Sequence, residues 1–125
     1  MRRRPLLSLA ALVALAPMVA SCLSPTLPLP PPDQPENISQ SSAGLWQVAG
    51  TCDAGAFVYV FNTSTGRGVF VEDKTGKGLY QVSLPGTQCD VAWVTQQVGD
   101  NESTETFFVL EPFTNGSVVD PTTCP

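Results

Sequence analysis

The chain has 125 residues and a formal charge of −5, from 11 acidic and 6 basic residues, which allows one small domain rather than two. It contains no histidine, the usual general base and the commonest metal ligand, so the composition disfavours a Ser-His-Asp enzyme and a metal centre. The acidic excess disfavours nucleic acid as a partner, because that binding depends on basic residues at the phosphates.

Residues 1–21 have the three parts of a secretory signal. Met1–Arg4 is basic, Leu6–Ala16 is apolar apart from one serine, and Val19–Ser21 supplies small residues for cleavage. A membrane-spanning helix needs about 20 apolar residues, more than this stretch offers, so the sequence predicts a cleaved export signal. Cleavage would remove three basic residues and leave a formal charge of −8.

The cleavage zone and the residue after it, Val19-Ala20-Ser21-Cys22, resemble a bacterial lipobox. The resemblance implies that Cys22 becomes the lipid-bearing N-terminus of a mature lipoprotein, and two or three acyl chains hold such a protein firmly on a membrane. Leu23 and Ser24 stand where lipoproteins of an inner membrane commonly carry Asp, so the resemblance points to the outer membrane of a bacterial cell envelope. A secreted protein without lipid is the alternative.

Residues 22–44 are predicted to form a tether between the anchor and a folded domain. Six prolines lie within Ser24–Glu36, and proline excludes helix and removes sheet donors. We expect a polyproline II spacer of about 3 Å per residue, with a ligand for a proline-binding domain as the alternative. Asn37–Gly44 is small and polar, and the tether is expected to extend through it.

From Leu45 the composition changes to short runs of Val, Phe, Tyr, Trp and Thr, separated by Gly, Asp, Asn and Pro. No segment of helical length keeps a helical period without a breaker. The pattern predicts a small antiparallel β-sandwich over 45–111, followed by an irregular tail at 112–125. Strands are expected near 45–50, 56–62, 67–73, 78–84, 90–98 and 105–111.

Three stretches of this region are similar to the bacterial Ig-like and carboxypeptidase-regulatory-like sandwich domains. The stretches are Gly50-x-x-Asp53-x-Gly55-Ala56-x-Val58-x-Val60, Asp73-x-x-Gly76-x-Gly78-x-Tyr80-x-Val82-x-Leu84-Pro85, and Asp90-Val91-Ala92-Trp93-Val94. The resemblance implies an Ig-like sandwich of six or seven strands with a structural or binding role and no catalysis. The chain departs from those domains by carrying cysteines at two loop positions.

The run 56–62 has two distinct faces, because successive side chains of a strand point in opposite directions. One face has Ala56, Val58 and Val60, and the other has Phe57, Tyr59 and Phe61. The resemblance places the valines inward. The aromatics are then either covered, as in a central strand, or exposed as a strip that binds a partner. Trp46 and Trp93 are expected to be core residues.

Besides the lipid-bearing Cys22, the exported chain has three cysteines: Cys52, Cys89 and Cys124. An oxidising compartment favours disulfides, and an odd number leaves one thiol over. In the strand order that the resemblance implies, the loops with Cys52 and Cys89 lie at one end, so Cys52–Cys89 is the favoured pair and Cys124 is free or pairs with another chain. Cys52–Cys124 and Cys89–Cys124 are the alternatives. A zinc site and a catalytic cysteine are not predicted, since histidine is absent.

Together these features predict a lipid-anchored module of the bacterial envelope that needs no cofactor and is not an enzyme. Its expected partners are the membrane, through Cys22, and a protein or glycan, unless its role is structural. An accessory or inhibitor domain acting on an exported enzyme is the alternative. An exposed aromatic strip would favour the binding module, and an ordered protruding loop at 99–104 would favour the inhibitor.

Overall fold

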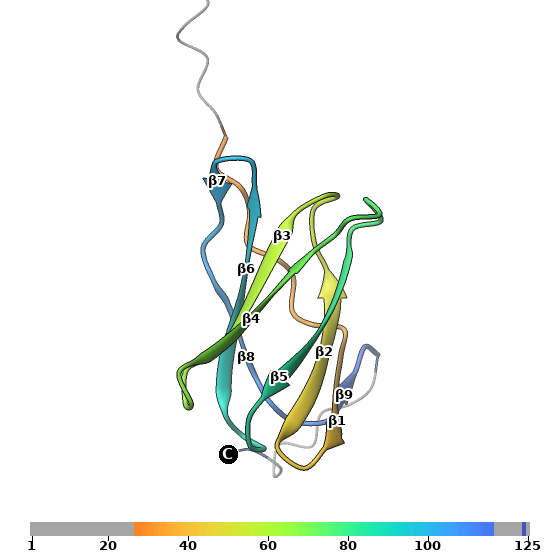
Figure 1. Ribbon diagram of the computed structural model, residues 1–125, viewed down its shortest axis with the longest axis vertical. Helices are drawn as coiled ribbons and strands as arrows, with labels where there is room; N and C mark the ends of the chain where they lie inside the picture. The colour runs from red at the N-terminus through yellow and green to blue at the C-terminus, as the bar shows by residue number, and fades with distance from the viewer. Residues whose placement is uncertain (1–26, 117–123, 125) are drawn as a thin grey trace, which may run out of the picture.

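The computed structural model describes residues 27–116 and residue 124. The predictions for the export signal at 1–21 and for the lipid on Cys22 lie outside these residues. All regular structure in the described part is β, arranged as two antiparallel sheets packed face to face (Figure 1). The predicted all-β sandwich is therefore confirmed. The described residues contain no helix long and apolar enough to span a membrane.

One sheet has the order β5-β2-β1-β9, and the other has the order β4-β3-β6, with both β7 and β8 paired to the remaining edge of β6. The predicted strands from residue 45 onward agree with observed strands to within two residues at each end. The bounds are β1 Asn37–Ser42, β2 Leu45–Thr51, β3 Phe57–Asn62, β4 Arg67–Glu72, β5 Leu79–Pro85, β6 Val91–Val98, β7 Asn101–Glu102, β8 Thr106–Val109 and β9 Phe113–Thr114.

The core lies between the two sheets and follows directly from the alternation of side chains along the strands. β2, β3 and β5 each alternate between buried and more exposed positions. This period of two puts one apolar face of each sheet against the other. Trp46 is fully buried in this layer, so its predicted core role is confirmed. The other large buried apolar side chains are Ile38, Val48, Val58, Val60, Tyr80, Val82, Leu84, Val94, Phe108 and Leu110.

The predicted tether is wrong at its C-terminal end, because β1 is a full member of the first sheet. It pairs with β2 along its length and with β9 on its other edge. Only Ile38 of β1 is buried, so the strand is held by backbone hydrogen bonds rather than by an apolar run that composition would reveal. The nine strands of the described residues exceed the predicted six or seven because β1, β7 and β9 are polar or very short.

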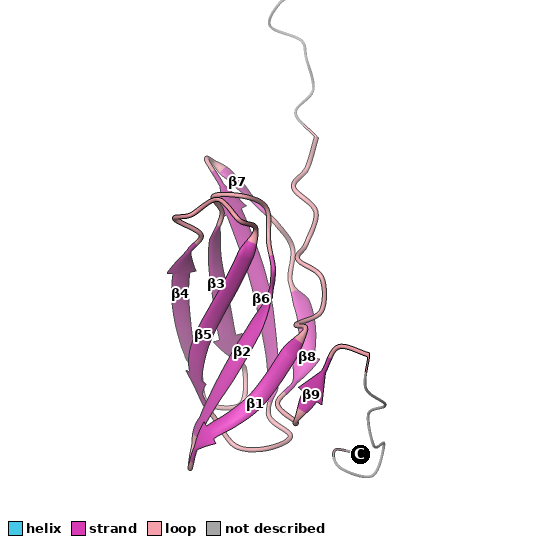
Figure 2. Cartoon of the chain, turned by 90° about the vertical axis from the view of Figure 1, so that its right-hand side faces the viewer, coloured by secondary structure: helices cyan, strands magenta, loops and turns pink. Residues whose placement is uncertain are grey.

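The proline-rich segment 30–35 lies along the sandwich rather than standing free of it (Figure 2). Pro32 and Pro35 are buried. Proline lacks a donor but keeps its carbonyl acceptor, and side chains of the domain use it. Gln96 Nε2 donates to the Pro30 carbonyl (2.9 Å) and Thr106 Oγ1 to the Pro32 carbonyl. A third hydrogen bond runs the other way, from Gln34 Nε2 of the segment to the Phe107 carbonyl of the domain (2.8 Å). The folded unit therefore begins near Pro30, not at Leu45.

Cys89 forms a disulfide with Cys124, with an S–S distance of 2.09 Å. The favoured Cys52–Cys89 pair is therefore wrong, as is pairing of Cys124 with another chain, and the alternative Cys89–Cys124 is present. The reason lies in the strand directions. β2 and β5 pair antiparallel over seven residues, so Cys52, just after β2, and Cys89, beyond the end of β5, lie at opposite ends of the sandwich. Cys52 is a free thiol.

Candidate binding site

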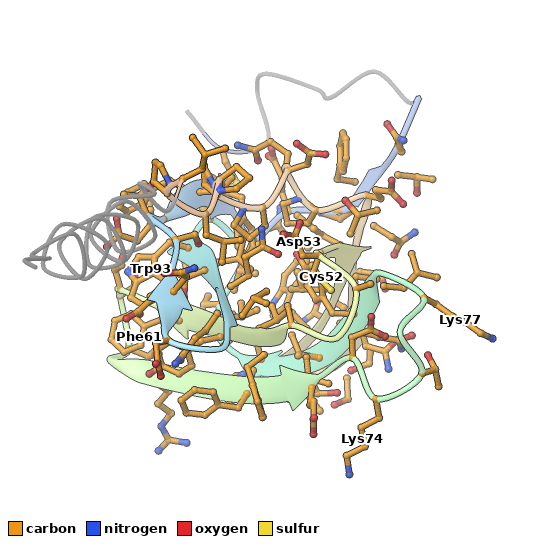
Figure 3. The ribbon with its side chains drawn as sticks, turned by 90° about the horizontal axis from the view of Figure 1, so that it is seen from above. Cys52, Asp53, Phe61, Lys74, Lys77 and Trp93 are labelled. Carbon is orange, nitrogen blue, oxygen red and sulfur yellow. A yellow bond between two sulfur atoms is a disulfide. The ribbon has the colours of Figure 1, made fainter. Side chains whose placement is uncertain are left out.

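Aromatic side chains gather on the outer face of the sheet β4-β3-β6-β8. The set, called the aromatic face below, consists of Phe57, Tyr59, Phe61, Phe70, Trp93 and Phe107. Strand pairing brings them together: Tyr59 is opposite Phe70, Phe61 is opposite Trp93, and Trp93 is opposite Phe107. Figure 3, which looks down on one end of the sandwich, shows Phe61 and Trp93 on the same side of the molecule.

The structure places the predicted strip of Phe57, Tyr59 and Phe61 on this outer face, with Val58 and Val60 buried behind it. Phe57 is half exposed, and the other two rings are partly buried. The expectation that Trp93 is a core residue is wrong, because the inward positions of β6 are those of Ala92 and Val94.

Phe70, Trp93 and Phe107 were not predicted as part of the site. They come from three other strands and reach the strip only through the pairing of β4, β6 and β8 with their neighbours. Alternation within β4 and β8 could have indicated that Phe70 and Phe107 point away from the core, but only the register shows that they extend the strip.

The rings of the aromatic face hold one another in place. Tyr59 is at the centre: its ring is stacked on Phe70 at a centroid distance of 4.4 Å and meets Trp93 edge-on at 5.4 Å. Phe61 lies 5.1 Å from Trp93. Gly68 makes room for this arrangement, since a Cβ there would overlap the Tyr59 ring. Such aromatic pairs contribute about 0.5–1.5 kcal/mol each beyond the area that they bury, so the face is a preorganised surface.

A groove of about 320 Å³ lies at the end of the aromatic face that carries Phe57. Phe57, Tyr59 and Phe70 line one part of it, and Thr95, Gln97 and Glu102 line the rest. Three rings of the face remain open to solvent: Phe70 is 73% exposed, Phe107 56% and Phe57 50%. The groove thus combines flat apolar surfaces with hydrogen-bonding groups, which is the make-up of a binding surface.

A wider groove of about 420 Å³ on another part of the sandwich is lined by Glu36, Glu72 and Asp73 among others. Three carboxylates in one groove raise the question of catalysis. The Asp73 carboxylate, however, accepts hydrogen bonds from the amides of Gly55 (3.0 Å) and Gly78 (2.7 Å). These bonds, that of Gly55 foremost, lower the pKa of Asp73, so this carboxylate holds two loops together and is a poor proton acceptor at neutral pH.

Asp73 should therefore make the stability of the fold depend on pH in the acidic range. A group whose pKa is lower in the folded state stabilises the fold above its unfolded pKa, and this contribution is lost as the pH falls through the folded pKa. We expect Asp73→Asn to lower the thermal midpoint at neutral pH and to flatten the loss of stability between about pH 5 and pH 2. Thermal melts of both proteins across this range test it, and parallel curves would contradict it.

Within the described residues, no group of three His, Cys, Asp or Glu side chains is placed to hold a metal ion. Cys52 lies in a small cavity under the proline-rich segment, lined by residues 30–33 together with Asp53 and Gln96. Burial raises the pKa of its thiol, and the negative charges of Asp73 and Asp53 raise it further. The thiol is thus neutral at physiological pH and a weak nucleophile.

The cover over Cys52 gives a test of whether the proline-rich segment is docked. Gln96 joins that segment to the domain, accepting from the Asp53 amide (2.7 Å) and donating to the Pro30 carbonyl. We expect Gln96→Ala to loosen the segment at Pro30, which lines the cavity of Cys52, and to speed alkylation of this partly buried thiol several-fold, because a covered thiol reacts faster when its cover opens more often. Gln81→Ala, on an exposed position of β5, is the matched control and should leave the rate unchanged. Equal alkylation rates in the unchanged protein, Gln96→Ala and Gln81→Ala would contradict the docking of the proline-rich segment.

Comparisons with protein-family models, curated proteins and solved structures find no match to this chain. A fold alone does not define a function, so function must be inferred from the aromatic face and its groove.

Proposed function

We propose that this chain is a non-catalytic binding module and that the aromatic face is its binding surface. One observation carries the proposal: the three exposed aromatic side chains of the described residues all lie on this face. Apolar surface in water is unfavourable, and a contiguous exposed patch of rings, bordered by polar groups, is typical of a surface that a ligand covers.

The same proposal places the module on a membrane of a bacterial envelope through lipid on Cys22. Pro30 follows Cys22 by only eight residues, which span at most about 28 Å when fully extended. Since the Pro30 carbonyl is bound to Gln96, such an anchor would keep the domain close to the membrane. The mass of the mature protein from bacterial membranes tests the anchor. A lipid increment on the Cys22 peptide is expected, and an unmodified Cys22 in a soluble fraction would overturn it.

Photo-crosslinking in the native bacterium tests the binding surface. A benzophenone amino acid replaces Phe70 in one variant and Leu79 in a matched control. Leu79 is 56% exposed on the other sheet. We expect a discrete adduct from position 70 and none from position 79. Absence of any adduct at position 70, or equal adducts at both positions, would overturn the proposed function.

A second candidate is the accessory or inhibitor domain, and one observation favours it. The loop predicted at 99–104 is ordered as a hairpin between β6 and β7, with a hydrogen bond from Gln97 Nε2 to the Gly99 carbonyl (3.1 Å). Figure 1 shows this hairpin at one extreme of the sandwich. A crosslink from Asp100 to an exported enzyme, with none from position 70, would favour this candidate over the aromatic face.

A further inference from the structure

We infer that the ligand of the aromatic face is a neutral carbohydrate chain lying in the groove between Phe57, Phe70 and Gln97. This inference rests on the proposed binding function and adds the chemical class of the ligand. It follows from three features of the groove: its charge, its size and the arrangement of its rings and polar groups.

The charge of the groove disfavours anionic ligands. Among the described residues that line it, Glu102 is the one that carries a charge, and none is basic. The basic residues of the described part are Arg67, Lys74 and Lys77, and Figure 3 shows both lysines on the side of the molecule away from Phe61 and Trp93. A nucleic acid, an acidic peptide or an anionic lipid headgroup would meet only negative charge here.

The size of the exposed apolar surface favours a slender ligand over a folded protein. With about 200 Å² for a whole aromatic side chain, the open parts of Phe57 and Phe70, the two exposed rings of the groove, amount to roughly 250 Å². Each partner of a standard protein interface contributes about 800 Å², of which roughly 450 Å² is apolar, so the groove offers little more than half of that apolar area. The exposed area of the groove is close to the size of functional patches on monomers, and a single extended chain can cover it.

The arrangement of groups matches the two sides of a sugar ring. A pyranose has a face of C–H groups, which carry slight positive charge, and an edge of hydroxyls. The open face of Phe70, on the side away from Tyr59, is negative and suits the C–H groups. Gln97 and Glu102 offer acceptors for the hydroxyls, and the Gln97 amide can also donate. An apolar ligand of the same shape would cover the side-chain oxygens of Gln97 and Glu102 without donating a hydrogen bond to them, which costs free energy.

Titration of the mature protein, extracted in detergent micelles, with defined ligands tests the inference. The probes are neutral oligosaccharides of increasing length: β-1,4-linked N-acetylglucosamine, β-1,4-linked glucose and α-1,4-linked glucose. An extended Gly/Ser/Asn peptide and single-stranded DNA are titrated in the same way, as probes from other ligand classes. Trp93 lies 5.4 Å from Tyr59 and reports binding by fluorescence, and calorimetry gives the affinity independently.

We expect at least one oligosaccharide series to bind saturably, with affinity rising with length until the groove is filled. Phe70→Ala and Gln97→Ala should each weaken binding about tenfold, while Leu79→Ala should leave it unchanged. Phe70 is exposed, so its replacement should not unfold the domain, and the thermal midpoint of each variant checks this. Binding of no series, binding of the peptide alone, or equal affinities of Phe70→Ala and Leu79→Ala would overturn the inference.

The two proposals fail in different ways. A protein adduct from position 70 in cells, together with no oligosaccharide binding, would overturn the carbohydrate ligand and leave the binding function standing. Absence of an adduct at position 70 would overturn both.

Discussion

Trp46→Ala is expected to lower the free energy of unfolding by about 3–5 kcal/mol, the range for removing a large aromatic side chain from a packed core. The Trp46 side chain has no exposed surface and lies between the two sheets with Val48 and Leu84. A domain of this size has only about 5–15 kcal/mol of stability, so a large fraction of it should be lost. Equilibrium unfolding in denaturant, followed by circular dichroism, measures the change.

Trp93→Ala is the matched control for this prediction. Trp93 is only partly buried and lies on the outer face, so its loss opens no cavity between the sheets. We expect it to cost about 1–2 kcal/mol, mainly from the lost ring contacts with Tyr59 and Phe61. Equal destabilisation by the two substitutions would show that the two tryptophans do not occupy different environments, and the assignment of the aromatic face to the outside would be wrong.

Removing the Cys89–Cys124 disulfide is expected to lower the free energy of unfolding by about 4 kcal/mol. The bond spans 35 residues, and a loop of that length restricts the unfolded chain by about this amount in the chain-entropy account. Cys89→Ser combined with Cys124→Ser, studied in denaturant, measures the loss without exposing a new thiol.

Cys52→Ser is the control, because Cys52 forms no disulfide. Its expected cost is under about 1 kcal/mol, as for a partly buried small side chain outside a network. If Cys52→Ser removed as much stability as the double variant, the pairing of Cys89 with Cys124 would be contradicted.

The sequence predicted the strands that have apolar alternation and turn residues at their ends. β3 and β5 are examples, because each has one strictly buried face that composition reveals. β1 was not predicted, because Asn37–Ser42 has a single buried side chain and depends on β2 for its hydrogen bonds. The docking of segment 30–35 was not predicted for a related reason. Its prolines accept hydrogen bonds through their carbonyls, and the donors come from residues far along the chain.

The candidate site was predictable only along one strand. Phe57, Tyr59 and Phe61 share a face by the period of two alone. Phe70 and Phe107 join them through strand register, which depends on the whole sandwich. The disulfide pairing could not be predicted from the sequence either, because it too depends on how the strands are arranged. Three cysteines allow three pairings, and the distance between Cys52 and Cys89 depends on the direction of β2 relative to β5, which spacing along the chain does not determine.

Hydroxyl-radical footprinting of the protein in its native envelope, compared with the same protein after extraction in detergent, tests the central claim most directly. Aromatic side chains oxidise readily when they are open to solvent, so the oxidation of each ring measures how far that ring is exposed. We predict that Phe57, Phe70 and Phe107 are protected in the envelope and oxidised after extraction, while Leu79 on the opposite sheet is oxidised equally in both. Equal oxidation of Phe70 in the envelope and in the extract would contradict the claim that this face binds a ligand.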